Sequence, residues 1–434
     1  MPAATKRPLH LNLFAMGVGH HKAAWRAPGS RVEDIGEIAY WQELARIAER
    51  GKLDALFLAD GQSVTASAMQ DGPLWFLEPI TALSAMSQAT DRIGLVCTIS
   101  ASFWTPYHAA RMLASLDHIS GGRAGYNVVT SMFDAEARNH GMDALPPHAE
   151  RYARAAEFVD AVRGLWRTWP ATSIRADRTG AYVDVERVRP VDHAGPQFRV
   201  AGPLNVPSPP QGEPVLFQAG ASPQGRALAA RYAEGIYAVA YDLHAAVEYR
   251  SDLRRRITAI GRDPDRTAIM PGLVTYVGST MAEARSKQAE LDDLLPVEAS
   301  LRQLSTFVGQ DTSHWELDAP VPELPPLQEF TGPKGRYATI LRIIETERPT
   351  VRQLLGRLAA GGGHCTMVGT AESIADEIEE WLDEGGADGF NLMPPSLPGG
   401  LVDFVNEVIP ELQRRGRFRT HYAGCSLRDH LGLV

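Results

Sequence analysis

The segment QAGASPQG at residues 218–225 carries the residue types of an anion-binding turn. Ser222 directly precedes Pro223, so it is placed to cap a helix that begins at the proline. Gly220 and Ala221 are small enough to let a ligand approach the backbone. The first turn of a helix offers free N–H groups and partial positive charge, which favours phosphate. A purely structural cap explains Ser222 equally well.

The helix opening HAERY places His148 and Tyr152 four residues apart. Side chains at this spacing lie on one face of a helix, one turn apart, where both could donate to a single phosphate. Taken alone, packing or capping is the more common explanation for such a pair.

Polar residues also stand where short apolar runs end. They are hydroxyls, amides and one carboxylate: Asp60-Gly61, Thr98 and Ser100, Asn127 and Thr130, and Gly220-Ala221-Ser222, with Gly19-His20-His21 after the first run. The spacing of His20 and His21 does not suit zinc, and neither a G-x-S-x-G elbow nor a phosphate-binding P-loop is present in the sequence. Such residues suit an organic cofactor that supplies the chemistry itself.

These residues need a scaffold that gathers strand ends, and the pattern of the chain predicts one. Eight short apolar runs predict strands at Leu9–Met16, Ala55–Ala59, Ile93–Ile99, Ala124–Val129, Val215–Ala219, Ile236–Ala240, Ala268–Val277 and Gly389–Met393. Helical patterns lie between most of them, and alternating strands and helices imply a parallel sheet. Eight such units predict an α/β fold, a closed (β/α)8 TIM barrel with its site at the carboxyl ends of the strands. The alternative is an open doubly wound sheet, but MGVGHH after the first strand lacks the expected glycine pattern.

Two stretches interrupt the alternation, and residues 1–434 are otherwise predicted to form one barrel domain. Residues 167–214 are rich in Pro and Gly and contain AYVDVERV, which predicts a β-hairpin-like excursion. Residues 281–363 form a long insertion before the last strand, either an active-site lid or a packing or oligomer arm.

The composition excludes several classes of protein. A net charge of −9 argues against nucleic acid or an anionic membrane as partner. Three cysteines without CxxC spacing predict neither a disulfide framework nor a zinc site, so we expect no metal. The N-terminal residues lack a signal-peptide pattern and no run is long enough to span a membrane, so the expected location is the cytoplasm.

Several long motifs occur together and in a fixed order. They are IGLVCTISASFWTPYHAARMLASLDHISGGRAGYNVVTS, DAEARNHG, HAERY, GPLNVPSPPQGEPVLFQAGASPQGR and LRDHLGLV. In these motifs the chain resembles the bacterial-luciferase-like flavin monooxygenases, and within them the nitrilotriacetate and dibenzothiophene-sulfone monooxygenase group. The resemblance implies a TIM barrel that binds FMN as FMNH2, which a separate NAD(P)H:flavin reductase supplies. It also implies that O2 and a small organic substrate react there, and that the protein is a homodimer or homotetramer.

Carried over position by position, the resemblance assigns residues to the two ends of the flavin. Asp60 and Thr98 would lie near the isoalloxazine and ribityl parts. His148, Tyr152 and Ser222 would surround the phosphate. Asn127 is a weaker addition, because it could also only support its strand end.

The substrate side rests on softer expectations. An apolar mouth of Phe14, Phe103 and Trp104 would keep water from the reaction, although both Phe103 and Trp104 suit a core equally well. A general acid or base would be His20 or His21, since imidazole titrates near neutral pH. His140 stands where the family leads us to expect phenylalanine, so it is a further candidate for the substrate pocket.

Two other functions keep the same barrel. One is hydride transfer with the deazaflavin F420, and the other is a flavin-binding protein without catalysis. The HAERY and GPLNVPSPPQGEP motifs argue against the first, and the polar strand ends argue against the second. Sulfone, amine, polyaminocarboxylate and haloaromatic substrates all remain open.

Overall fold

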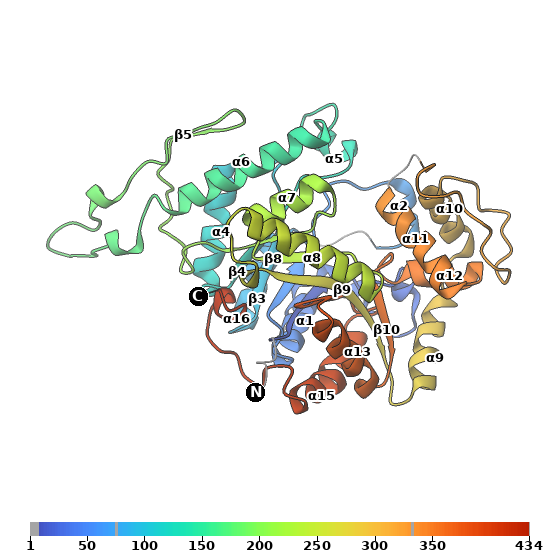
Figure 1. Cartoon of the computed structure of the whole chain (residues 1–434). Coiled ribbons are helices and arrows are strands. Elements are labelled where there is room, and N and C mark those ends of the chain that lie inside the picture. The colour runs from blue at the N-terminus through green and yellow to red at the C-terminus, as the bar shows by residue number, and fades with distance from the viewer. Residues whose placement is uncertain (1–7, 74–76, 331–333, 434) are drawn as a thin grey trace.

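Eight parallel strands close into a barrel, as predicted (Figure 1). The computed structural model describes residues 8–73, 77–330 and 334–433. The barrel strands are β1 (His10–Ala15), β2 (Ala55–Leu58), β3 (Gly94–Ser100), β4 (Ala124–Val129), β7 (Val215–Gln218), β8 (Gly235–Ala238), β9 (Ala268–Val277) and β11 (Gly389–Leu392). Pairing of β9 with both β8 and β11 completes the ring. Each strand lies within two residues of its predicted bounds, because its apolar run is buried on both faces.

Helices surround the barrel in the expected alternation. They are α1 (Ile38–Arg50), α3 (Pro79–Met86), α4 (Pro106–Ser120), α6 (His148–Trp166), α7 (Pro223–Tyr232), α8 (Leu243–Ala259), α13 (Ala371–Asp383), α14 (Gly399–Asp403) and α15 (Ile409–Arg414). Outward-facing strand residues such as Leu13, Leu95 and Tyr126 pack against this helical layer. Every helix among the described residues is too short or too polar to cross a membrane.

Side chains fill the inside of the barrel, and the C-terminal segment closes its lower end. Three aromatic rings pack across the interior. The Tyr237 ring centroid lies 4.6 Å from that of Phe57 and 5.0 Å from that of Phe217. Below them α16 (Leu427–His430) inserts Leu427 against Gly94 and Gly125, where a β-carbon would collide with it. The amino-terminal end of the barrel is thus sealed, which leaves the carboxyl ends of the strands for a site.

One further strand follows the long insertion, and the sequence analysis did not predict it. Strand β10 (Cys365–Gly369) pairs with the second half of β9, outside the closed ring. β9 is ten residues long, so its first half serves the barrel while its end diverges to meet β10.

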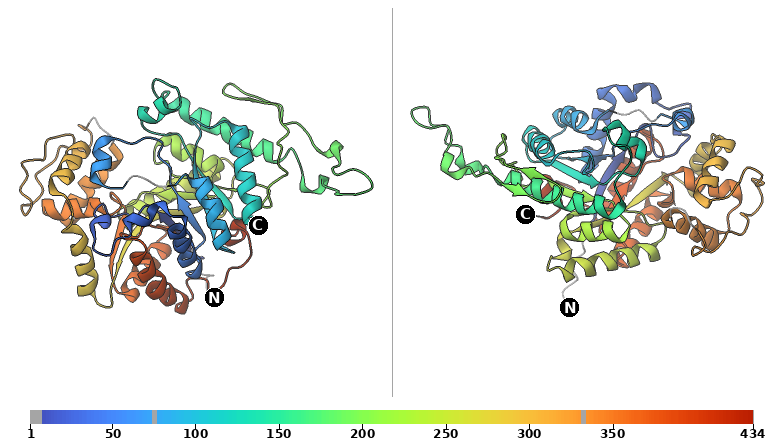
Figure 2. Two further views of the ribbon diagram at one scale, coloured as in Figure 1. Left: turned by 180° about the vertical axis from the view of Figure 1, so that it is seen from behind. Right: turned by 90° about the horizontal axis from the view of Figure 1, so that it is seen from above.

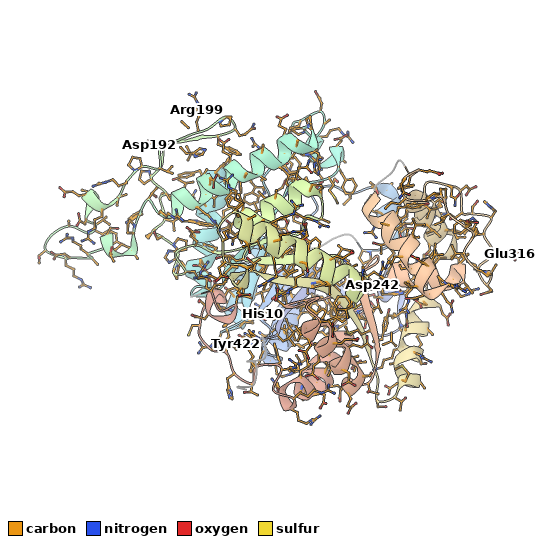
Figure 3. The ribbon with its side chains drawn as sticks, viewed as in Figure 1. His10, Asp192, Arg199, Asp242, Glu316 and Tyr422 are labelled. Carbon is orange, nitrogen blue, oxygen red and sulfur yellow. The ribbon has the colours of Figure 1, made fainter. Side chains whose placement is uncertain are left out.

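The two insertions lie on opposite sides of the molecule (Figures 1 and 2). Residues 167–214 run outward as an extended excursion that includes the hairpin strands β5 (His193–Ala194) and β6 (Arg199–Val200). Asp192 and Arg199 mark this side in Figure 3, and Glu316 marks the other. The excursion was predicted, but its hairpin was misplaced. AYVDVERV contributes only a single bridge between Ile174 and Val183 and a 3-10 turn, because its residues are mostly exposed.

Residues 281–363 fold into helices with a core of their own. These are α9 (Met281–Asp292), α10 (Val297–Val308), α11 (Lys334–Glu347) and α12 (Val351–Ala359). The last three pack around Trp315 and Tyr337, whereas α9 lies against β9 and β10. Asp242, which caps α8, binds Arg342 of α11 at 2.5 Å and ties the insertion to the barrel (Figure 3).

Candidate active site

Helix α7 begins with the predicted cap. The Ser222 hydroxyl accepts a hydrogen bond from the Gly225 amide at 3.1 Å, and Pro223 occupies the first turn. This turn follows directly from the carboxyl end of β7, so the positive end of the helix faces the barrel mouth. The sequence S-P was sufficient to predict this feature.

Helix α6 brings Tyr152 to the same turn. A β-carbon on Gly220 would lie 3.1 Å from the Tyr152 hydroxyl and 2.8 Å from the Cα of Gly225. The His148 ring lies beside Tyr152, with centroids 4.8 Å apart. Four of the residues predicted for a phosphate site are therefore together, and only glycine fits at position 220, because the Gln218 side chain and the Gly225 backbone pack against it.

A nearby arginine is already bound elsewhere. Arg226 pairs with Asp252 at 2.8 Å, donates to the Ala221 carbonyl and stacks on Tyr249. Attraction for an anion at this turn therefore comes from the helix end and from the Tyr152 and His148 side chains.

Thr98 and Asn127 face each other on neighbouring strands of the barrel. They are register partners of β3 and β4, and the Asn127 amide donates to the Thr98 hydroxyl at 3.3 Å. Both are nearly fully buried, and the carbonyl oxygen of the Asn127 side chain has no partner among the described residues. A buried acceptor without a donor carries a free-energy cost, so this oxygen fits a ligand that brings an N–H or O–H group.

Asp60 ends β2 beside a small cavity of about 150 Å³. Gln62 donates to its carboxylate at 2.7 Å. Burial raises the pKa of Asp60 above its usual value, Gln62 opposes this shift, and nearby Glu78 and Glu136 add to it. Met16 and Gly61 line the same cavity, which places Asp60 at the edge of the barrel mouth.

A second cavity of about 320 Å³ lies between the loop after β1 and the long insertion. One wall is Met16–Lys22 with Trp25, and the opposite wall comes from α10, with Ala299 and Gln303. Because Met16 lines both cavities, the two adjoin. The insertion therefore helps to enclose the space next to the mouth, as a lid would.

The two predicted catalytic histidines differ in their surroundings. His20 is buried and its Nε2 donates to the Phe14 carbonyl at 2.9 Å. Burial lowers the pKa of His20 to about 4, so the ring is neutral near pH 7. His21 uses both nitrogens, because Nδ1 accepts from the Ala23 amide and Nε2 donates to Asp292 of α9, each at 3.1 Å. His21 thus fastens the loop to the insertion.

The family model described as luciferase-like monooxygenase matches residues 16–389. The chain belongs to this family. It is 42% identical to N-acetyl-S-(2-succino)cysteine monooxygenase of Bacillus subtilis (strain 168) and to nitrilotriacetate monooxygenase component A of Aminobacter aminovorans, in each case over 99% of this chain and 97% of the relative. The structure of EDTA monooxygenase from Chelativorans sp. BNC1 superposes with a TM-score of 0.84 at 35% identity, over 99% of each chain. The protein is thus a flavin-dependent monooxygenase, an enzyme that acts on a small organic molecule.

Of the residues expected around the apolar mouth of this monooxygenase, some lie at the mouth and others pack in the core. The His140 ring stacks on Phe103, with centroids 4.3 Å apart, and its Nε2 contacts Gln62. His140 is therefore linked through Gln62 to Asp60. Trp104 packs against the helix-facing core, and Phe14 lies between Phe57 and His20 inside the barrel.

A half-buried histidine of the monooxygenase, His364, was not predicted from the sequence. His364 precedes β10, and a β-carbon on Gly272 of β9 would run into its Nδ1, which has no partner among the described residues. Burial, and after it the neighbouring His20 and Arg336, lower the pKa of His364 to about 4. The signal in the sequence was the run of glycines 361–363, all with positive φ, that turns the chain back to the mouth.

Proposed function

We propose that this chain is the oxygenating component of a two-component system. It takes FMNH2 from a separate NAD(P)H:flavin reductase and uses O2 to oxygenate a small organic substrate. The convergence of Tyr152, Gly220 and the capped start of α7 carries the proposal, because the Tyr152 hydroxyl and the positive end of a helix meet there and both favour a phosphate. One relative supports the division of labour, because it is called nitrilotriacetate monooxygenase component A.

The described residues fit FMN at both of its ends. The phosphate would be held by Ser222, Tyr152 and His148 at the start of α7, where Gly220 and Ala221 leave room. The polar edge of the ring system would meet Thr98 and Asn127, since the free Asn127 oxygen accepts an N–H. Asp60 would lie beside them at the end of β2. When bound, reduced FMN supplies the activation of O2.

The protein's own part is to orient the reactants and to exclude water. The insertion helix α10 and the loop Met16–Lys22 enclose the space beside the mouth. His20 donates its Nε2–H to the Phe14 carbonyl, so Nδ1 is left as a hydrogen-bond acceptor, and burial keeps the ring neutral near pH 7. Enclosed sites of this kind suppress side reactions with water.

The same proposal covers the domain organisation, the oligomeric state and the location of the chain. Residues 1–434 would act as one barrel domain with two insertions, in a homodimer or homotetramer in the cytoplasm. A reducing compartment suits the three cysteines, which are all free.

An oxygen-18 experiment tests the proposed function. The protein is supplied with FMN, NADH and a flavin reductase under oxygen-18 gas, with a panel of sulfones, amines, polyaminocarboxylates and haloaromatics. We expect one label per product molecule for at least one class, and none when the reductase is omitted. Turnover that requires reduced F420 instead of FMNH2, or product without label, would contradict the proposal.

A further inference from the structure

Two cations lie near each other beside the mouth, and among the described residues neither has a carboxylate bound to it, although Asp71 lines the same cavity as Lys22. Lys22 lies in the wall of the 320 Å³ cavity, and Arg336 begins helix α11 of the insertion. Neither forms an ion pair within residues 8–73, 77–330 and 334–433, whereas Arg31, Arg226 and Arg417 each bind one or more acidic side chains. Both side chains are exposed, so an anionic ligand can reach them.

The position of Arg336 is fixed by two contacts. Its guanidinium donates to the Gly362 carbonyl at 2.9 Å and lies over the Phe307 ring at 4.7 Å. Phe307 and Lys22 line one small recess, so Arg336 packs on a ring that borders the recess of Lys22. These contacts use one of the five guanidinium N–H groups for hydrogen bonding, which leaves further donors for a ligand.

The charge of Arg336 acts on Lys22. Partial burial and then this charge lower the pKa of Lys22 to about 8, while Asp71 at the end of α2 (Ala66–Asp71), which lines the same cavity, opposes the shift. Arg336 also lowers the pKa of His364 at the barrel mouth. Like charges held this close repel each other, and an anion between them removes the repulsion.

We propose that Lys22 and Arg336 form a subsite that binds a carboxylate of the substrate and directs the rest of the molecule toward His20 and His364. The inference rests on the proposed function, because it assumes that oxygenation takes place beside this cavity. The volume suits a small molecule. The flavin phosphate is assigned elsewhere, since α6 and α7 lie across the barrel mouth from α10 and α11 (Figure 1).

Matched acid and amide pairs test the subsite. Calorimetry on the anaerobic, FMNH2-loaded protein compares succinate with succinamide, and nitrilotriacetate with its triamide. We expect the acid to bind more tightly in each pair, and Lys22→Gln or Arg336→Gln to weaken acid binding by roughly ten- to a hundredfold. Amide binding should not change. The control Arg302→Gln removes an exposed arginine of α10 outside the cavity lining and should behave as wild type.

The pH dependence separates a bound charge from a structural effect. Groups near the Lys22 ammonium are Arg336 from α11, Asp71 from α2, and the neutral His20 and His364; of these, only Lys22 titrates between pH 7 and 9. Acid binding by wild type should therefore weaken across that range. Lys22→Arg should bind the acid and lose this dependence, since guanidinium stays charged.

Some outcomes would overturn the subsite and others would not. No acid preference in either pair, or the same pH dependence in Lys22→Arg as in wild type, would overturn it. Titration of FMNH2 alone, run in parallel, keeps the two claims apart. Normal FMNH2 binding without acid preference refutes only the subsite, whereas no FMNH2 binding refutes the proposed function.

Discussion

Replacing Tyr152 by phenylalanine should weaken FMNH2 binding without changing the stability of the protein. The Tyr152 hydroxyl has no hydrogen-bond partner within the described part of the chain, while its ring packs against the helical core. Phenylalanine keeps that packing, so we expect the free energy of unfolding to stay within about 0.5 kcal/mol of wild type. The lost contact with the phosphate is a charge-assisted hydrogen bond of about 1.5–3 kcal/mol, or roughly 10- to 150-fold in Kd.

Anaerobic fluorescence titration gives the affinity, and urea unfolding gives the stability. The matched control is Tyr232→Phe on α7, whose hydroxyl donates to the Ala156 carbonyl of α6 at 3.1 Å. That variant should lose about 1 kcal/mol of stability and keep its FMNH2 affinity. An unchanged Kd for Tyr152→Phe would refute the assignment of the phosphate to this turn, and so would an equal loss of affinity in Tyr232→Phe.

Three further predictions concern the cap, the buried pair and the barrel seal, and a fourth concerns pH. Ser222→Asp should keep the cap of α7 and yet weaken FMNH2 binding, because its charge repels phosphate; tighter binding would contradict the site. Asn127→Leu removes a buried acceptor without a partner, so thermal unfolding should show little loss of stability while FMNH2 affinity falls. Leu427→Ala should cost about 2–5 kcal/mol in urea unfolding by opening the sealed end, and a smaller cost would show that α16 is dispensable. Since His20 and His364 have folded-state pKa values near 4, below the ordinary 6.5, stability should be complete above pH 6.5 and fall as the pH drops toward 4; His364→Gln should reduce that slope.

The barrel was predictable because its strands are continuous apolar runs. β10 was not, because Cys365–Gly369 alternates buried and half-buried residues and follows three glycines that suggest a loop. The cap at Ser222 follows from local sequence alone, whereas the place of His364 depends on how β9 diverges toward β10.

Contacts between residues far apart in the sequence explain the remaining differences between the predicted and the observed site. His21 was predicted as a candidate general acid or base, and only the folded insertion brings Asp292 to it. Lys22 and Arg336 lie far apart in the sequence, so their closeness in the fold has no sequence signature. Hydrogen-bond partners and spatial neighbours depend on tertiary packing, which periodicity does not record.

Anaerobic titration of the wild-type protein with reduced FMN and with reduced riboflavin tests directly whether the protein binds FMN through its phosphate. The two ligands differ only in the phosphate, which we assign to the start of α7 beside Tyr152 and Gly220. We expect reduced FMN to bind at least about tenfold more tightly than reduced riboflavin, because the phosphate accepts one or more charge-assisted hydrogen bonds. Equal affinity for the two, or binding of neither, would contradict it.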